Sequence, residues 1–284
     1  MEIIKKIENL REKLQSHRQS CKKIGFVPTM GYLHQGHMNL VNKAVIDNEI
    51  VVLSIFVNPT QFGPDEDYED YPRDLKRDAA KAKKAGVDYI FTPEVEEMYP
   101  QGYNTLVQVN ELTERLCGAS RPSHFQGVTT VVSKLFNIVE PDTAYFGQKD
   151  YQQFVVIKRM VQDLNFSINL NMVPIVREDD GLAVSSRNKY LNSEQREAAT
   201  ILYDALSSGK EMILEGERDA VKVKNTMEAM IEDEQLAIKD YVAVVDSKTL
   251  KPVSKISGDV VMAMAVFIGE TRLIDNFYIR EDEL

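Results

Sequence analysis

The sequence has little of what cross-links, zinc sites and membrane spans require. Its two cysteines, Cys21 and Cys117, stand far apart and outside any metal-ligand or CxxC spacing, which indicates neither a disulfide framework nor a zinc site. Its longest apolar runs, such as GDVVMAMAVFIG, are of strand length and fall short of the roughly 20 residues of a membrane helix. The apolar residues of the N-terminus are spaced as in a helix and not as in a signal peptide. We therefore expect a soluble, cytoplasmic protein with no membrane partner.

Clusters of basic residues are also missing. The formal net charge is −10 and the Lys and Arg residues form no run, which argues against nucleic acid as the main partner. A polyanionic ligand must then be met locally, by a few placed cations, by a metal ion or by the N–H groups at helix N-termini. With 284 residues, of which 43% are hydrophobic, the chain is long enough to bury the core of one large domain or of two ordinary ones.

Apolar runs of strand length alternate with amphipathic helical stretches through the first two thirds of the chain. The strand-like runs are KIGFVPT, EIVVLSIFV, VDYIFTP, TAYFG and INLNMVPIV. Near-continuous apolar strands separated by helices are typical of a parallel sheet covered on both faces. We predict a Rossmann-like, doubly wound α/β domain over residues 1–175.

The pattern changes after INLNMVPIV. A polar segment without clear period is followed by helical stretches up to about Asp233 and then by three apolar runs separated by turn residues. Helices followed by such strands favour a second, smaller α+β domain with an antiparallel sheet, which we place at residues 176–284.

Two of only four histidines lie close together, in PTMGYLHQGH at residues 28–37. The strand KIGFVPT ends there and a helix is expected to begin near His37, at the sheet edge where α/β proteins bind ligands. Gly31 and Gly36 permit a tight turn, and the helix N-terminus offers N–H groups to an anion. The pattern H-x-G-H, with His34 and His37, resembles the nucleotide-binding element of the class I aminoacyl-tRNA synthetase and nucleotidyltransferase superfamily. The alternatives are a packed core histidine or a pair of metal ligands, for which no third ligand stands nearby.

Four longer segments narrow this resemblance. PTMGYLHQGH, FVNPTQFGPDEDYEDYPRD at 56–74, SHFQGVTTVVSKLFNIVEPDTAYFGQKDYQQ at 123–153 and SSRNKYL at 185–191 are similar, in this order, to the pantoate–beta-alanine ligase family. The resemblance implies ATP-dependent condensation of (R)-pantoate with β-alanine through a pantoyl adenylate, with release of pyrophosphate and then AMP, in coenzyme A biosynthesis. It also implies a homodimer through the N-terminal domain. ATP is used with Mg²⁺, which takes few protein ligands, so we predict no dedicated metal site.

The resemblance carries family roles onto individual residues. It makes His37 the proton donor and His34 and Lys149 the other catalytic residues, where hydrogen-bond donors and a point charge suit the negative charge of phosphoryl transfer. Asp150 is expected to meet the ribose hydroxyls or the shell of Mg²⁺, although a lone Lys-Asp pair is more often a solvated surface pair. The whole predicted ATP set is Met30, Gly31, Tyr32, Leu33, His34, Gln35, Gly36, His37, Gly147, Gln148, Lys149, Asp150, Val176, Val184, Ser185, Ser186 and Arg187.

The segment VSSRN at 184–188 has a second interpretation. Two hydroxyls and a guanidinium suit triphosphate oxygens, while the same residues also suit a loop whose serines cap a short helix. The family commonly has methionine where this chain has Val184, which leaves a backbone contact there. Val176 is expected to meet the adenine through its backbone.

Amide side chains in NPTQFG are the candidates for substrate binding. Asn58 and Gln61 follow a strand at the predicted site edge, and an amide supplies both a donor and an acceptor. The resemblance gives Gln61 a contact to pantoate and later to β-alanine, and gives Gln153 a contact to pantoate. The segment also has the composition of a turn.

Several assignments stay open. Arg121, His124 and Tyr71 are either substrate contacts or ordinary packed residues, and His17 is expected in solvent on the N-terminal helix. Two other functions remain as alternatives: a nucleotidyltransferase that stops after nucleotidyl transfer, and a nucleotide-binding regulatory module without turnover.

Overall fold

The computed structural model describes residues 1–64 and 66–284 and divides into two compact units. Unit 1 comprises Met1–Asn110, Arg121–Gln148 and Gln153–Pro174, and unit 2 comprises Glu111–Ser120, Lys149–Gln152 and Ile175–Leu284. The predicted boundary after residue 175 lies one residue from the observed one, and two short segments, 111–120 and 149–152, also group with unit 2.

Unit 1 is built on a six-stranded parallel sheet with the order β1-β4-β3-β2-β5-β6. Its strands are β1 (Glu2–Ile4), β2 (Ile24–Thr29), β3 (Ile50–Ile55), β4 (Tyr89–Phe91), β5 (Thr143–Gly147) and β6 (Asn169–Val173). From β2 the chain adds β3 and β4 on one side and later β5 and β6 on the other. The strand order therefore reverses between β2 and β5, which is the point where such sheets bind ligands. The predicted doubly wound sheet is confirmed.

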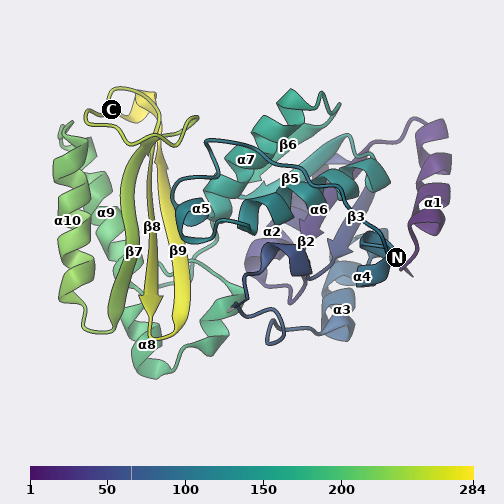
Figure 1. Ribbon diagram of the computed structural model, residues 1–284, viewed down its shortest axis with the longest axis horizontal. Helices are drawn as coiled ribbons and strands as arrows, with labels where there is room; N and C mark the ends of the chain where they lie inside the picture. The colour runs from purple at the N-terminus through teal and green to yellow at the C-terminus, as the bar shows by residue number, and fades with distance from the viewer. Residues whose placement is uncertain (65) are drawn as a thin grey trace. The chain divides into compact units, whose positions relative to one another are not determined.

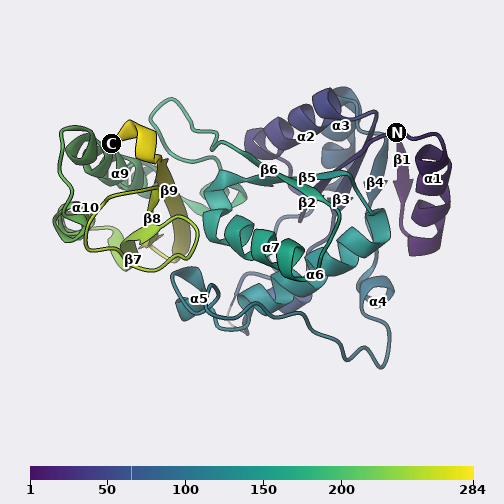
Figure 2. The same cartoon turned by 90° about the horizontal axis from the view of Figure 1, so that it is seen from above.

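Helices cover both faces of this sheet. Figure 2 shows α2 and α3 on one face and α6 and α7 on the other, and α1 packs against α6. The helices of this part of the chain are α1 (Ile7–Gln19), α2 (Gln35–Asp47), α3 (Leu75–Ala85), α4 (Val95–Met98), α6 (His124–Val139) and α7 (Tyr151–Asp163), with the 3-10 turns η1 (Pro59–Gln61) and η2 (Gln148–Asp150). The strands are buried on both faces because each face is covered, which explains their continuous apolar sequences.

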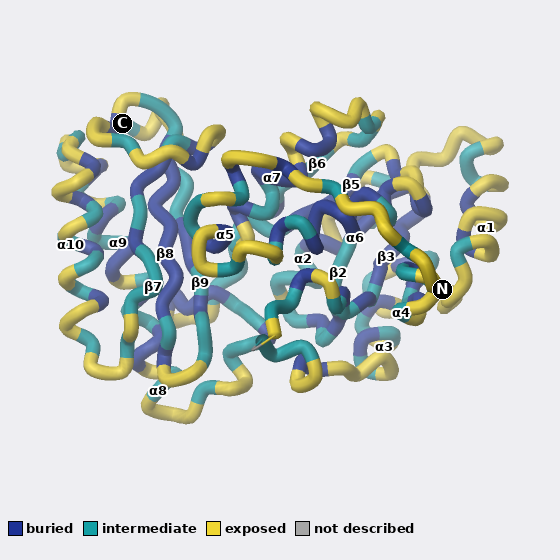
Figure 3. The backbone as a smooth tube through the Cα atoms, in the orientation of Figure 1, coloured by how far each residue is buried: buried dark blue, intermediate teal, exposed yellow. Residues whose placement is uncertain are grey.

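Unit 2 contains the antiparallel sheet β7-β8-β9 that the sequence predicts. Its elements are β7 (Ala237–Asp246), β8 (Val260–Ile268), β9 (Thr271–Ile279), the helices α5 (Cys117–Ser120), α8 (Ser193–Ala198), α9 (Ile201–Leu214) and α10 (Ala220–Asp233), and the 3-10 turns η3 (Ser186–Tyr190) and η4 (Glu281–Glu283). Helices α9 and α10 lie against one face of the sheet (Figure 1). The central strand β8 is buried almost throughout (Figure 3), and alternate residues such as Met262 and Met264 share a core with the two helices.

No helix in the described ranges 1–64 and 66–284 is long and apolar enough to cross a membrane.

Helix α6 touches the segment that follows β3, and Gly127 makes this contact possible. A Cβ at this position would lie 2.3 Å from the Thr60 carbonyl oxygen and 2.6 Å from the Gln61 Cα. Both are backbone atoms, so no side-chain rotation can relieve the overlap. The absence of a side chain at Gly127 therefore sets how closely α6 approaches the turn that carries Gln61.

We expect Gly127→Ala to lower the free energy of unfolding by about 2 kcal/mol, because overpacking a close backbone contact displaces one of the two segments. Denaturant unfolding followed by circular dichroism measures the change. The matched control is Gly258→Ala, since a Cβ built there has no heavy atom within 4 Å among the described residues other than those of Gly258 and its two chain neighbours. Equal unfolding midpoints for the two variants would show that the contact is not tight.

Candidate functional site

The loop after β2 turns sharply at a glycine and a tyrosine. Gly31 has φ 89° and Tyr32 has φ 51°, both in the left-handed region. Such a conformation is unusual for tyrosine and must be stabilised by its surroundings. The Asp78 carboxylate supplies that stabilisation, because it accepts the backbone N–H groups of Tyr32 at 2.6 Å and Leu33 at 2.8 Å.

Helix α3 holds Asp78 in place against this loop. The helix begins after Asp74, whose side chain accepts the Arg77 N–H, and it ends at Gly86 in the left-handed conformation. Asp78 is only 1% exposed. Burial raises the pKa of its carboxyl group, although the two loop N–H groups and the nearby cations act in the opposite direction.

Two further side chains of α3 contact the same loop. The Lys81 ammonium donates to the Leu33 carbonyl at 2.7 Å, and the Arg77 guanidinium lies 4.4 Å from the centre of the Tyr32 ring. The sequence analysis does not identify Asp78. The available signal is its position four residues before Ala82, which places a charged residue on the buried face of the helix.

The two histidines cap helix α2, which begins at Gln35, two residues before the predicted start. The His34 Nδ1 atom accepts the Gly36 N–H at 3.2 Å, and the His37 Nδ1 atom accepts the His34 N–H at 3.4 Å. Since Nδ1 is the acceptor in both neutral rings, the proton of each lies on Nε2. The rings are 3.9 Å apart between centroids. The loop thus presents two imidazole N–H donors beside the N-terminus of a 13-residue helix.

A metal site at this pair would need at least one further ligand from the described ranges. No group of three or more His, Cys, Asp or Glu side chains there is arranged to hold a metal ion.

Gln61 lies at the same sheet edge, in η1 after β3. The side chains of Asn58 and Gln61 are both buried, and the Asn58 Nδ2 atom donates to the Gln61 Oε1 atom at 3.2 Å. The Gln61 Nε2 atom in turn donates to the Met30 sulfur at 3.3 Å. The fold therefore brings the predicted substrate-binding amide to the first residue of the histidine loop.

Arg121 and His124 act on the backbone of Gln61. The Gln61 carbonyl accepts from the His124 ring at 2.9 Å and from the Arg121 guanidinium at 3.4 Å. Arg121 also pairs with the Glu66 carboxylate. Burial tends to raise the pKa of Glu66, but the hydrogen bond and charge of Arg121 outweigh it and lower the pKa. Tyr71 is buried and packs edge-on against Phe62, with ring centroids 6.0 Å apart.

The remaining predicted residues of unit 1 follow β5. Gly147 is the last residue of this strand and Gln148 comes next, while Gln153 lies in the first turn of α7. Because β2 and β5 are parallel neighbours, their carboxyl ends share the edge at the reversal of the strand order.

Unit 2 carries the predicted lysine and its neighbour. The Lys149 ammonium lies 3.9 Å from the Asp150 carboxylate, and the Lys149 carbonyl accepts from the Asn276 amide at 2.9 Å. The ion pair is long and Asp150 is half exposed, so the pair contributes little and leaves the ammonium able to exchange partners. The hydrogen bond from Asn276 on β9 to the Lys149 carbonyl fixes the position of the Lys149 backbone.

The predicted phosphate-binding loop of unit 2 follows a short hairpin. The Val184 N–H donates to the Val176 carbonyl at 2.9 Å. Ser185 is the N-cap of η3, and its hydroxyl accepts the Arg187 N–H at 3.3 Å. The capping interpretation is therefore confirmed for Ser185, and it leaves the phosphate interpretation of Ser186 and Arg187 as a prediction. The predicted ATP set is divided between the units, since Met30–His37, Gly147 and Gln148 belong to unit 1 and the other members to unit 2.

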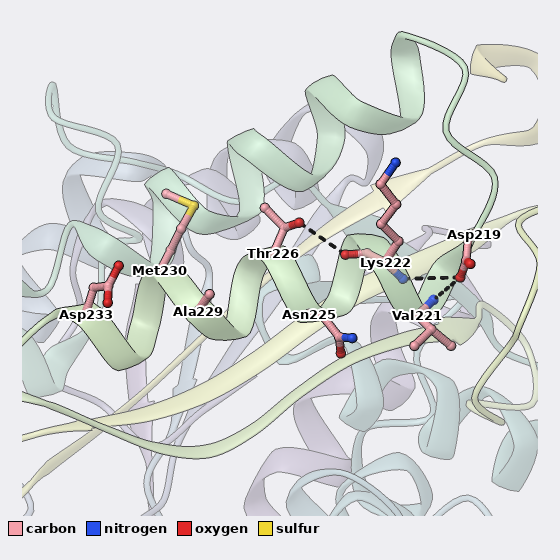
Figure 4. A pocket seen from close by; sticks show the side chains of 8 residues that line it. All are labelled: Asp219, Val221, Lys222, Asn225, Thr226, Ala229, Met230 and Asp233. Atoms are coloured by element: carbon pink, nitrogen blue, oxygen red, sulfur yellow. Dashed lines mark hydrogen bonds between the residues drawn. The ribbon is translucent and has the colours of Figure 1, made fainter.

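A pocket of about 570 Å³ lies along α10 in unit 2 (Figure 4). It is lined by Asp219, Val221, Lys222, Asn225, Thr226, Ala229, Met230 and Asp233. The Asp219 carboxylate is engaged in capping α10 through the N–H groups of Val221 and Lys222. None of the predicted site residues lines this pocket.

Comparison with known proteins gives a consistent result. The family model described as pantoate-beta-alanine ligase matches residues 2–278. The pantothenate synthetase of Moorella thermoacetica is 59% identical over 276 residues, which are 97% of this chain and 98% of the relative. The crystal structure of pantothenate synthetase from Thermus thermophilus aligns with a TM-score of 0.93 and 48% identity, covering 98% of this chain and 99% of the other. The crystal structure of pantoate-beta-alanine ligase from Francisella tularensis, complexed with beta-gamma ATP and beta-alanine, aligns with a TM-score of 0.80 and 35% identity. This alignment covers 99% of this chain and 98% of the other.

We expect Asp78→Asn to destabilise the histidine loop, because an amide cannot accept both loop N–H groups and one hydrogen bond to a charged group contributes about 2 kcal/mol. Hydrogen exchange of the Tyr32 and Leu33 amides should become faster, and the free energy of unfolding should fall. Asp74→Asn on the same helix is the matched control, since asparagine caps a helix as well as aspartate does. Unchanged exchange at both loop amides in Asp78→Asn would contradict the assignment.

Proposed function

Because the chain belongs to the pantoate–beta-alanine ligase family, we propose that it joins pantoate to β-alanine with ATP, forming pantothenate and releasing pyrophosphate and AMP. The observation that carries the site assignment is the loop Met30–His37, where two imidazole N–H donors stand at a helix N-terminus. The Francisella tularensis relative, whose structure is complexed with beta-gamma ATP and beta-alanine, supports ATP as a substrate of this chain.

The first half-reaction forms a mixed anhydride. The pantoate carboxylate attacks the α-phosphorus of ATP, a new P–O bond forms, and the bond to the β-phosphate oxygen breaks to release pyrophosphate. Negative charge spreads over the non-bridging oxygens of the α-phosphate as this happens. The Nε2–H groups of His34 and His37 and the N-terminus of α2 are suited to stabilise that charge, each donor being worth on the order of 10²-fold in rate.

The residues assigned to phosphate within unit 2 are two cations and a hydroxyl. Lys149 offers a compact ammonium, and Arg187 offers a planar guanidinium that can form two parallel hydrogen bonds to phosphate. Ser186 adds a hydroxyl donor. These groups would bind the anionic ligand through local positive charge, which is needed because the chain as a whole has a net charge of −10.

The second half-reaction consumes the adenylate. The amine of β-alanine attacks the acyl carbon, the C–N bond forms, the amine loses a proton, and AMP leaves with the electrons of the C–O bond. Gln61 is assigned to pantoate first and then to the incoming β-alanine, and Gln153 to pantoate. An amide suits this role because it binds without adding charge beside a carboxylate.

Mg²⁺ enters this scheme with the nucleotide. It would keep most of its water shell and neutralise phosphate charge, so a single carboxylate near the triphosphate would be sufficient on the protein side. Asp150 is the candidate, for the Mg²⁺ shell or for the ribose hydroxyls. We also expect a homodimer, whose sedimentation mass would be twice the 32.3 kDa of one chain, and a cytoplasmic site of action.

The test of the proposed function is product analysis by mass spectrometry. Purified protein is incubated with Mg²⁺, ATP, pantoate and β-alanine, and a parallel tube lacks β-alanine. Pantothenate with AMP is expected in the first tube, and pantoyl adenylate with pyrophosphate in the second. Adenylate formation without any amide product would favour a nucleotidyltransferase, while the absence of turnover in both tubes would favour a binding module. His37→Ala should abolish the turnover of the wild type.

We expect Lys149→Ala to slow adenylate formation in a single turnover while the unfolding midpoint stays unchanged, because the substitution removes a phosphate-binding charge from a partly exposed position. Lys158→Ala, an exposed lysine on α7, is the control. A Lys149→Ala variant that forms the adenylate at the wild-type rate would remove this lysine from the site.

We expect Gln61→Ala to raise the KM for pantoate by about tenfold, the value of one hydrogen bond, with little change in the KM for ATP. Gln162→Ala, on the exposed side of α7, should leave both constants unchanged. If only the KM for ATP responded to Gln61→Ala, the assignment of the pantoate pocket would be wrong.

A further inference from the structure

The side chain of Asn58 is fully occupied by the protein. Its Nδ2 atom donates to the Gln61 Oε1 atom at 3.2 Å and to the Gly127 carbonyl at 3.2 Å. Its Oδ1 atom accepts from the Tyr99 hydroxyl at 2.7 Å and from the Thr60 hydroxyl at 3.0 Å. A primary amide has two N–H donors and two acceptor positions, and all four are used here. A substrate could bind Asn58 only by displacing one of these hydrogen bonds.

The direction of this network is set by the Gly127 carbonyl, which can only accept. The atom of Asn58 that faces it must be the nitrogen, so the oxygen faces Tyr99 and Thr60, whose hydroxyls must donate. The second N–H of Asn58 then meets the oxygen of Gln61. The Gly127 carbonyl thus selects the orientation of the Asn58 amide, and the Tyr99 and Thr60 hydroxyls hold the amide from its other side. The Asn58 amide in turn orients Gln61.

The orientation of the Gln61 amide decides whether a ligand meets its N–H groups or its carbonyl oxygen. With its oxygen bound to Asn58, the Gln61 Nε2 atom points to the Met30 sulfur at 3.3 Å. A thioether is a weak acceptor, so an oxygen of the substrate would make a stronger hydrogen bond in its place. A reversed Gln61 would instead present its carbonyl oxygen to a substrate carboxylate, which is repulsive.

The surroundings of Tyr99 hold its hydroxyl as a donor to the Asn58 oxygen. Tyr99 follows α4, and its ring packs edge-on against Tyr103, with centroids 5.1 Å apart, and near Phe56 at 6.3 Å. A tyrosine hydroxyl is protonated at neutral pH, and burial raises the pKa of Tyr99 further, to about 12. Removing this hydroxyl would leave Thr60, which is exposed to solvent, as the other donor to the Asn58 oxygen.

We propose that Tyr99 is a positioning residue of the ligase: its hydroxyl holds the Asn58 amide, which turns the N–H groups of Gln61 toward pantoate. Asn58 then acts through Gln61, whereas the sequence predicts a direct substrate contact for it. The inference rests on the proposed function, because it takes pantoate as the ligand of Gln61.

The test is Tyr99→Phe, which keeps the packed ring and removes the donor. The KM for pantoate should rise about tenfold, as expected for one hydrogen bond, while the KM for ATP and the unfolding midpoint stay at wild-type values. Tyr103→Phe is the matched control, because this neighbouring ring takes no part in the Asn58 network. An unchanged KM for pantoate, or equal changes for both substrates, would overturn the proposal.

A double-mutant cycle tests the route through Asn58. In an Asn58→Ala background, Tyr99→Phe should have no further effect on kcat/KM for pantoate, whereas a full independent effect contradicts the relay. The ¹⁵N–¹H signals of the Gln61 side-chain amide give a readout that needs neither turnover nor the Asn58 variant. They should shift in Tyr99→Phe and not in Tyr103→Phe, and unshifted signals in both refute the positioning role. A wild type that makes no pantothenate would count against the proposed function alone, since the amide signals still decide the role of Tyr99.

Discussion

The parallel pairing of β2 with β3 and β5 is the constraint on which the site in unit 1 depends. Because neighbouring strands run in the same direction, the segments after them leave the sheet at one edge. β2 and β3 end in register, with Thr29 opposite Ile55. The histidine loop and the turn of Gln61 therefore emerge side by side. Everything else in unit 1 serves to fix the conformation of these two short segments.

Each segment is fixed by buried polar groups that come from elsewhere in the chain. Asp78 holds the left-handed turn after β2 from helix α3. Asn58 holds Gln61 and is itself held by Tyr99 and Gly127. In both cases a buried polar side chain has its partners, which is the condition for burying it at all. The proposed site residues of these two segments thus follow the ends of strands, in a turn or at the start of a helix, while the groups that orient them come from other parts of the chain.

The fold was predictable because its signals are local and repeated. Continuous apolar strands, separated by amphipathic helices, specify a covered parallel sheet, and the H-x-G-H and NPTQFG segments sit at strand ends that can be recognised by pattern. The helical spacing predicted at the N-terminus is confirmed for Ile7–Gln19 but was wrong for Ile3 and Ile4, which lie in the short strand β1. Three residues are too few to carry a periodicity of their own. His17 lies on the N-terminal helix as predicted, but it is only partly exposed, and its ring bonds the Tyr89 hydroxyl at 2.8 Å. Contacts such as Tyr99 to Asn58 join residues 41 positions apart. No local pattern specifies such pairs, so the supporting residues appear only once the chain is folded.

Gly127 has a consequence for how sequences of this family can vary. It carries no functional group, yet its carbonyl sets the direction of two amides and its missing side chain sets their distance from α6. Alanine at this position would keep the carbonyl, but its Cβ would overlap the backbone of the turn. A substitution there therefore forces either the helix or the turn to move. Over evolutionary time this position should be as restricted as the histidines themselves, and a scan for invariant residues would mark it as functional although it touches no reactant.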